Sequence, residues 1–312
     1  MYTRLVNALT EAYAAAEAKN IEDQALSKSI SDIFLANHLG HHLAPGGQGA
    51  DAFDAHGRLY EYKCNTGNRV QCIFNLGANR GLATNIQHVR AKFGPITGIY
   101  YAQLEWGEVR HVAYVPTETF LPALERHIEH NVRGGLLAWN LPWDAFLRIP
   151  GARLVAGPSV ASYPSVANPL LIAHGEAQAH GLEMGLFAKG AHNHLFLAQR
   201  EQHRLPIGGH QGHDAEDDAG GYEYKISVGG IYNFHFGARK SEAENRALIE
   251  SKCDGIVAAY CATRTYARLE RIHRIPSRDL LRLLLLRERA TAGGQMNLQI
   301  PRVELQRFLA HP

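Results

Sequence analysis

The chain contains an internal duplication, and this feature constrains its fold more than any other. Segments of the first half recur in the second half in the same order, at offsets that drift only from 157 to 163 residues. A chain of 312 residues has room for two domains of about 150 residues each. The sequence therefore predicts two colinear copies of one domain. The longest matched pairs are Phe34–Ala36 with Phe196–Ala198, Leu43–Asp51 with Leu205–Asp214, Tyr60–Lys63 with Tyr222–Lys225, and Phe74–Ala78 with Phe234–Ala238.

The boundary between the copies is indicated by composition. Residues 149–169 are rich in Pro, Gly, Ser and Ala, which is typical of a linker. We therefore predict a first domain at residues 1–150, a linker at 151–167 and a second domain at 168–312.

Each half shows the same order of expected elements. A helix is followed by a Gly-rich turn, two strands, a polar helix and an apolar run that has the composition of a buried central strand. This order predicts an α/β fold in which each repeat has a mixed central sheet flanked by helices. The expected elements are helices at 23–37 and 184–202, strands at 70–76 and 230–236, helices at 83–93 and 242–252, and buried strands at 96–102 and 255–261, with a last helix opening at 276–279.

Composition gives weaker constraints. Hydrophobic content of 46% and charged content of 20% are typical of a globular protein, and a net charge of +2 does not by itself indicate nucleic-acid binding. The Ala-rich N-terminal helix at residues 1–20 is interrupted by charges, so we expect neither a signal peptide nor a membrane span. The four cysteines lack the spacing of a zinc site, and we expect reduced thiols in a cytoplasmic protein.

The strongest chemical pattern lies on the strand after the Gly-rich turn. Asp51 precedes Glu61 by ten positions, and Lys63 follows Glu61 at a spacing of two. Alternate residues of a strand face the same way, so Glu61 and Lys63 share one face while Tyr60 and Tyr62 share the other. Two carboxylates and open water positions suit Mg²⁺, and a neighbouring lysine can stabilise charge on a reacting phosphate.

The same pattern occurs in the second copy, as Asp214, Glu223 and Lys225. The loop between the aspartate and the strand has diverged, yet the acidic residues, the tyrosines and the lysine agree in both halves. A single copy of this spacing would carry little weight, because it arises by chance and is also typical of a solvated surface strand. Two copies at matched positions favour a functional site over a solvated surface strand.

Asp followed by Glu-x-Lys on a helix–strand–strand unit resembles the PD-(D/E)xK nuclease superfamily, which includes many type II restriction endonucleases. The resemblance covers residues 21–102 and 182–261, with Ala50 and His213 where the literal motif has proline. It implies metal ligands at Asp51, Glu61, Asp214 and Glu223, catalytic lysines at Lys63 and Lys225, and Mg²⁺ as cofactor with Mn²⁺ as a substitute. Accessory acids on the first helix of each repeat are expected at Glu22 and Glu183.

In each half, candidate DNA-reading residues follow the strand that carries the glutamate and the lysine. Arg and Asn can read guanine and adenine edges, and Arg or Lys also binds phosphate. An ordinary solvated helix start would contain the same residue types. The candidates are Asn75, Asn79 and Arg80 in the first half and Asn233, His235, Arg239 and Lys240 in the second.

These features together predict a Mg²⁺-dependent, site-specific double-strand DNA endonuclease that acts as a monomer with two active sites. A duplex has two antiparallel strands, so cutting both requires two sites, and a duplicated chain would supply both as a pseudodimer. The alternatives are a structure-specific repair or junction nuclease with the same chemistry, and a non-catalytic duplicated DNA-binding protein.

Overall fold

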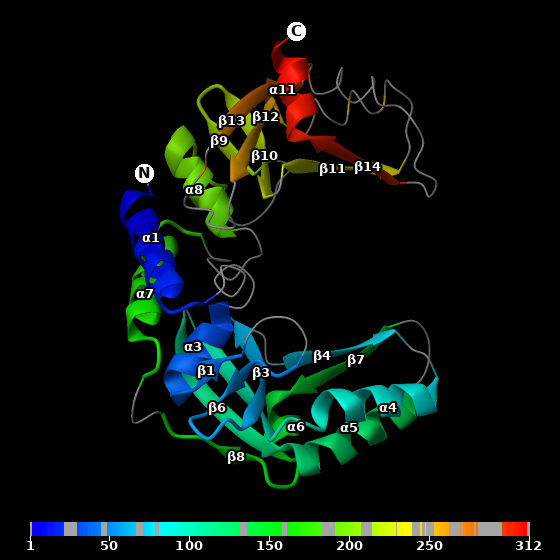
Figure 1. The fold of residues 1–312 in the computed structure, drawn as a ribbon. Helices are drawn as coiled ribbons and strands as arrows, with labels where there is room; N and C mark the ends of the chain where they lie inside the picture. Colours follow the sequence, from blue (N-terminus) through cyan, green and yellow to red (C-terminus); the bar gives the residue numbers. More distant parts are fainter. Residues whose placement is uncertain are drawn as a thin grey trace. The chain divides into compact units, whose positions relative to one another are not determined.

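The computed structural model shows a chain that divides into two compact units (Figure 1). It describes residues 2–310 apart from 22–29, 45–48, 67–70, 79–80, 106, 132–135, 158–160, 183–190, 207–213, 229, 239–243, 245–246, 248–252, 262–268, 270, 278 and 280–294. The first unit consists of residues 14–175, and the second combines residues 1–13 with residues 176–312. The units therefore differ from the predicted domains, because residues 1–13 belong to the second unit and residues 168–175 to the first.

The first unit is built on a six-stranded mixed sheet in the order β1-β2-β3-β5-β6-β8. The central strands β3 and β5 are parallel, and the other pairings in the sheet are antiparallel. The strands are β1 (His42–Leu43), β2 (Ala52–Phe53), β3 (Leu59–Thr66), β5 (Gly98–Glu105), β6 (Glu108–Pro116) and β8 (Arg153–Leu154).

Helices cover this sheet and close its core. α4 (Leu82–Phe93) and α5 (Thr117–Asn131) lie side by side and place Phe93 and Phe120 in a cluster with buried residues of β5 and β6 (Figure 1). Burial of a large apolar side chain of this kind contributes about 1.5–3 kcal/mol. The first unit also contains α3 (Ile30–Leu39), α6 (Trp143–Leu147) and most of α7 (Pro164–Ala179), whereas most of α1 (Thr3–Ala18) belongs to the second unit.

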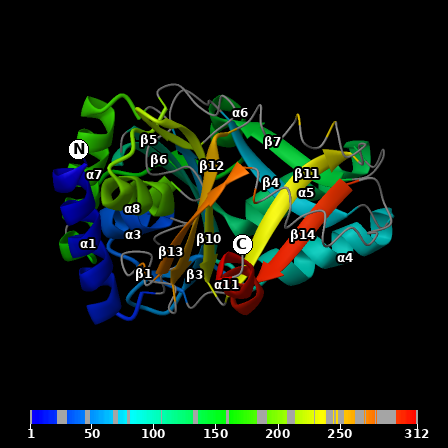
Figure 2. The same ribbon diagram turned by 90° about the horizontal axis from the view of Figure 1, so that it is seen from above.

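A two-stranded antiparallel ribbon extends from the sheet. It pairs β4 (Gln71–Ala78) with β7 (Leu136–Pro142), and its register shifts between Asn75 and Gly77. The view from above shows this ribbon beside α5 (Figure 2). Because β4 follows β3 directly in the chain, the ribbon begins close to the strand that carries Glu61 and Lys63.

The second unit repeats the central part of this arrangement. Its sheet has the order β13-β12-β10-β9, in which β10 and β12 are parallel, as β3 and β5 are in the first unit. A second ribbon pairs β11 with β14, with a register shift between Phe236 and Ala238. The elements are α8 (Ala191–Glu201), β9 (Ala215–Asp217), β10 (Gly220–Val228), β11 (Ile231–Ala238), β12 (Gly255–Cys261), β13 (Arg271–Pro276), β14 (Gln295–Pro301) and α11 (Arg302–Ala310).

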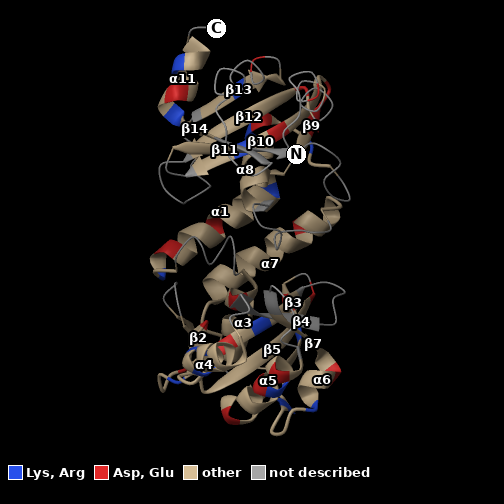
Figure 3. Ribbon diagram, turned by 90° about the vertical axis from the view of Figure 1, so that its right-hand side faces the viewer, with Lys and Arg blue, Asp and Glu red and all other residues tan. Residues whose placement is uncertain are grey.

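The core of the second unit lies between its sheet and α11. Leu305 of α11 packs in a buried cluster with Ile256 of β12 and Ile300 of β14. α11 also carries basic and acidic residues (Figure 3). A helix with both apolar and charged residues is typical of one that covers a sheet.

The predicted α/β class with mixed sheets is confirmed. The expected buried strands at 96–102 and 255–261 correspond to β5 and β12, and the helix at 83–93 corresponds to α4. The stretch 151–167, expected as a linker, contains β8 and the start of α7. Most of the helix expected at 242–252 lies outside the described residues. In the part of the chain that the structure describes, every helix is too short or too polar to cross a membrane.

Candidate active sites

The first site is formed on β3, where Glu61 and Lys63 project from the same face. Lys63 Nζ donates a hydrogen bond to Glu61 Oε1 at 2.7 Å, and the side chain of Glu61 is only 4% exposed. Burial alone would lower the pKa of Lys63, but the nearby charges of Glu61 and Asp51 outweigh it and raise that pKa. Lys63 is therefore a protonated cation at neutral pH.

Asp51 is held against the same strand by the backbone. The Tyr62 N–H donates to Asp51 Oδ2 at 2.7 Å, and the Asp51 N–H donates to the Tyr60 carbonyl at 2.9 Å. Burial and the charge of Glu61 raise the pKa of Asp51. The structure thus brings two carboxylates and a lysine together, as the sequence predicted, and the carboxylates repel each other unless a cation offsets their charge.

The second site repeats these contacts on β10. The Tyr224 N–H donates to Asp214 Oδ2 at 2.8 Å, and the Asp214 N–H donates to the Tyr222 carbonyl at 2.8 Å. Lys225 Nζ donates to Glu223 Oε1. The acid–acid–lysine set therefore has the same local geometry in both units.

On the other face of β3 and of β10, a histidine packs against two tyrosines of the strand. His41 Nδ1 is hydrogen-bonded to the Tyr62 hydroxyl at 2.8 Å, and its ring stacks on Tyr60 at 4.8 Å. In the second unit His203 makes the same bond to Tyr224 at 2.9 Å. The alternation expected for a strand is confirmed, because the tyrosines contact these buried histidines while the lysines contact the carboxylates.

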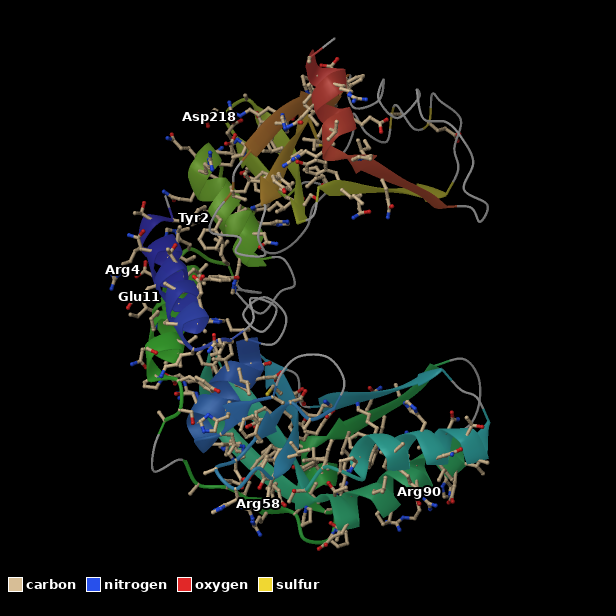
Figure 4. All side chains as sticks on the ribbon, in the orientation of Figure 1. Tyr2, Arg4, Glu11, Arg58, Arg90 and Asp218 are labelled. Carbon is tan, nitrogen blue, oxygen red and sulfur yellow. The ribbon has the colours of Figure 1, made fainter. Side chains whose placement is uncertain are left out.

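The turn before each active strand is also built in the same way. Asp54 accepts backbone hydrogen bonds from His56 and Arg58 and a side-chain bond from Tyr60. Asp217 accepts backbone bonds from Ala219 and Gly220 at the start of β10. Figure 4 labels Arg58 at the first of these turns and Asp218 at the second. These bonds fix the direction in which the strand enters the site.

The two sites differ in their surroundings. Lys92 of α4 places its Nζ 3.5 Å from Glu61 Oε1, so a second lysine faces the first site. In the second site His194 of α8 lies with Nδ1 3.9 Å from Asp214 Oδ1. The side chain of Glu223 is 29% exposed, against 4% for Glu61. The glutamate of the second site is thus the more exposed of the two, whereas Lys63 and Lys225 are both 21% exposed.

Three of these neighbours were missed by the sequence analysis. Lys92 lies on α4, the helix that follows β4, and nothing in its spacing links it to Glu61. The negative charge of Asp32 of α3 helps to raise the pKa of Lys63. Asp32 aligns with His194 at the offset of 162. The match of Phe34 with Phe196 at that same offset was a usable signal, because it placed Asp32 and His194 at equivalent points of two helices.

Several expected residues cannot be placed in the sites. The accessory acids Glu22 and Glu183 lie outside the described residues, as do Asn79, Arg80, Arg239 and Lys240. The remaining candidates for base reading lie on the ribbons: Asn75 on β4, and Asn233 and His235 on β11. Of these, Asn233 has a described side chain, and it is exposed.

Among the described residues no group of three or more His, Cys, Asp or Glu side chains forms a metal cluster. Each site instead offers two carboxylates, which is the protein contribution that Mg²⁺ commonly accepts when water and a substrate phosphate fill its other positions. The donor set therefore fits Mg²⁺ and does not fit a structural zinc centre. Comparison with known proteins finds no matching family model and no matching curated protein.

Proposed function

We propose that the chain is a Mg²⁺-dependent, site-specific endonuclease that cuts both strands of duplex DNA with two active sites in one polypeptide. The observation that carries this proposal is the repeated site: in each unit an aspartate is bonded to the backbone of the active strand, and the glutamate and lysine of that strand are bonded to each other. A structural role would not require the aspartate, the backbone N–H, the glutamate and the lysine to be arranged in the same way in both units.

The carboxylates would hold the metal ion. Asp51 with Glu61, and Asp214 with Glu223, supply hard oxygen ligands on one face of each strand. The bound ion would polarise the scissile phosphate and lower the pKa of a coordinated water. The pKa of Asp51, which burial and Glu61 raise, indicates a site where added positive charge is favourable.

The lysines would stabilise charge on the reacting phosphate. Since the pKa of Lys63 is raised, its ammonium group is charged and cannot act as a general base at neutral pH. In the reaction a bond forms between the water oxygen and phosphorus, and one ester bond to phosphorus breaks. One water proton ends on the leaving hydroxyl and the other on the new phosphate monoester. Lys63 and Lys225 are placed to offset the negative charge that grows on the phosphate oxygens.

The ribbons support site-specific cutting. The major groove of B-DNA admits a two-stranded β-ribbon, where base edges can be distinguished by hydrogen bonding. β11–β14 is such a ribbon, it follows the active strand β10 directly, and it carries the exposed side chain of Asn233. The β4–β7 ribbon has the same place in the first unit.

The test is cleavage of supercoiled plasmid and of a complex genomic DNA with Mg²⁺, with Mn²⁺, with Ca²⁺ and with EDTA. We expect discrete fragments with Mg²⁺ or Mn²⁺, none with EDTA, and binding without cutting with Ca²⁺. A smear of fragments would indicate that the nuclease cuts DNA without sequence specificity. A gel shift without cleavage in every metal would contradict the proposal and favour a DNA-binding protein.

A further inference from the structure

The first helix of the chain packs on the second repeat. Tyr13 of α1 is hydrogen-bonded through its hydroxyl to His192 Nδ1 of α8 at 3.0 Å, and its ring meets Phe196 edge-on at 6.0 Å. Tyr2 accepts a hydrogen bond from the Leu205 N–H at 2.9 Å (Figure 4). These contacts explain why residues 1–13 belong to the second compact unit.

The first helix of the second repeat packs on the first repeat. Tyr163, next to the start of α7, accepts a hydrogen bond from the Leu43 N–H at 3.0 Å and donates its own N–H to Asn37 Oδ1 at 2.8 Å. His174 of α7 meets the Phe34 ring of α3 edge-on at 5.7 Å. These partners all lie within the first compact unit.

Two of these contacts occur in both sets: a leucine N–H donates to a tyrosine hydroxyl, and an aromatic ring meets a phenylalanine edge-on. Tyr2 aligns with Tyr163 and Tyr13 with His174, both at an offset of 161. Their partners also align, because Leu43 and Leu205, and Phe34 and Phe196, are related by an offset of 162. Unrelated packing would not pair equivalent residues in both directions, so the repeats exchange their first helices reciprocally.

The exchanged helices lie against the elements that support the sites. α8 carries both His192, which contacts Tyr13, and His194, which lies beside Asp214. α3 carries Phe34, which contacts His174, and Asp32, whose charge acts on Lys63.

The chain segments after these helices complete the link. His41 and His203 bond the tyrosine hydroxyls of the active strands. Leu43 and Leu205, each two residues further along, bond the exchanged tyrosines. α1 is therefore linked to β10 through α8 and residues 203–205. In the same way α7 is linked to β3 through α3 and residues 41–43.

We propose that the first helix of each repeat positions the active site of the other repeat, with Tyr2 and Tyr13 acting on the Asp214 site and Tyr163 and His174 on the Asp51 site. The role of these sites rests on the proposed nuclease function, whereas the exchange itself does not. A substitution in the first helix of one repeat then lowers the activity of the catalytic site in the other repeat.

The exchange is tested in the full-length chain by hydrogen–deuterium exchange of a matched pair of variants. Tyr2→Phe and Tyr163→Phe each remove one hydroxyl that accepts a backbone N–H, and neither empties the core. We expect Tyr2→Phe to speed amide exchange in peptides covering 191–206 by about tenfold and to leave 30–44 unchanged. Tyr163→Phe should do the reverse. Faster exchange confined to the variant's own repeat would overturn the proposal.

The positioning role is tested with half-active chains. In a Lys63→Ala background only the Asp214 site can cut, and in a Lys225→Ala background only the Asp51 site can cut. We expect Tyr13→Ala to slow nicking of plasmid about tenfold in the first background and not in the second, with Tyr13→Phe giving a smaller loss in the same background. His174→Ala should show the opposite pattern.

The outcomes separate the two proposals. Equal losses in both backgrounds, or losses at the site of the same repeat, would overturn the positioning role. If the parent chain cuts no DNA in any metal, the nuclease function fails, and the exchange measurement still decides whether the helices are exchanged.

Discussion

Lys92 Nζ lies 3.5 Å from Glu61 Oε1, so α4, the helix that follows β4, contributes a second positive charge to the first site. Its side chain is 33% exposed and its ammonium also lies over the Phe93 ring at 5.0 Å. This position allows Lys92 to face a bound phosphate while it partly neutralises the carboxylate pair. The first site thus has a cation that the sequence pattern did not indicate.

We predict that Lys92→Ala slows cutting of one strand about tenfold, because one charged contact near the phosphate is lost. The other strand should be cut at the parental rate. The measurement is cleavage of a duplex labelled on each strand in turn. Lys19→Ala, which removes an exposed lysine just after the end of α1, is the matched control and should leave both rates unchanged. Equal slowing on both strands would contradict a role confined to the first site.

Asp54 gives a prediction about pH. Burial raises its pKa, but the hydrogen bonds from Arg58, His56 and Tyr60 outweigh this and hold the pKa well below its usual range. Ionised Asp54 therefore favours the folded state. Its contribution is fully present above the unfolded pKa of about 4 and is lost as pH falls through the lower folded pKa.

We expect Asp54→Ala to lower the free energy of unfolding of the first unit by about 1–3 kcal/mol at pH 7. The difference from the parent should shrink steadily below pH 4. Denaturant unfolding of both chains at a series of pH values measures it. A difference that stays constant down to pH 2 would show that the loss comes from packing rather than from the ionised carboxylate.

The divergence of the ribbons predicts that the target need not be a perfect palindrome. Asn233 on β11 aligns with Ile73, and Asn75 aligns with His235. A bidentate contact between a side chain and a base is worth about 1–3 kcal/mol of discrimination. We expect Asn233→Ala to relax base preference on one half-site only, as read by sequencing the ends of fragments cut from a complex genome. A uniform loss of affinity with an unchanged consensus would indicate phosphate contact at this position.

The sequence predicted those parts of the structure that depend on local pattern. β5 and β12 were visible as apolar runs, and the pairing of Glu61 with Lys63 follows from strand alternation. That Asp51 lies near Glu61 was expected from its place at the end of the Gly-rich turn. These features need only neighbouring residues to be specified, and the duplication doubled the signal for each of them.

The features that the sequence did not predict depend on long-range packing. Matching offsets align α1 with α7, but they cannot show which repeat each helix packs against, since both repeats present an equivalent partner. The start of α7 was assigned to a linker because of its prolines. Pro164 occupies the first helical position, where proline is tolerated because its missing N–H would be unsatisfied there anyway.

The central claim is that Lys63 and Lys225 serve two separate active sites, one for each strand. The most direct measurement compares supercoiled plasmid treated with the parent chain, Lys63→Ala, Lys225→Ala and the double variant, with Lys19→Ala as the control. We predict linear product from the parent and the control, nicked circles as the end product of each single variant, and no cutting by the double variant. A single variant that still makes linear product at the parental rate would contradict the claim.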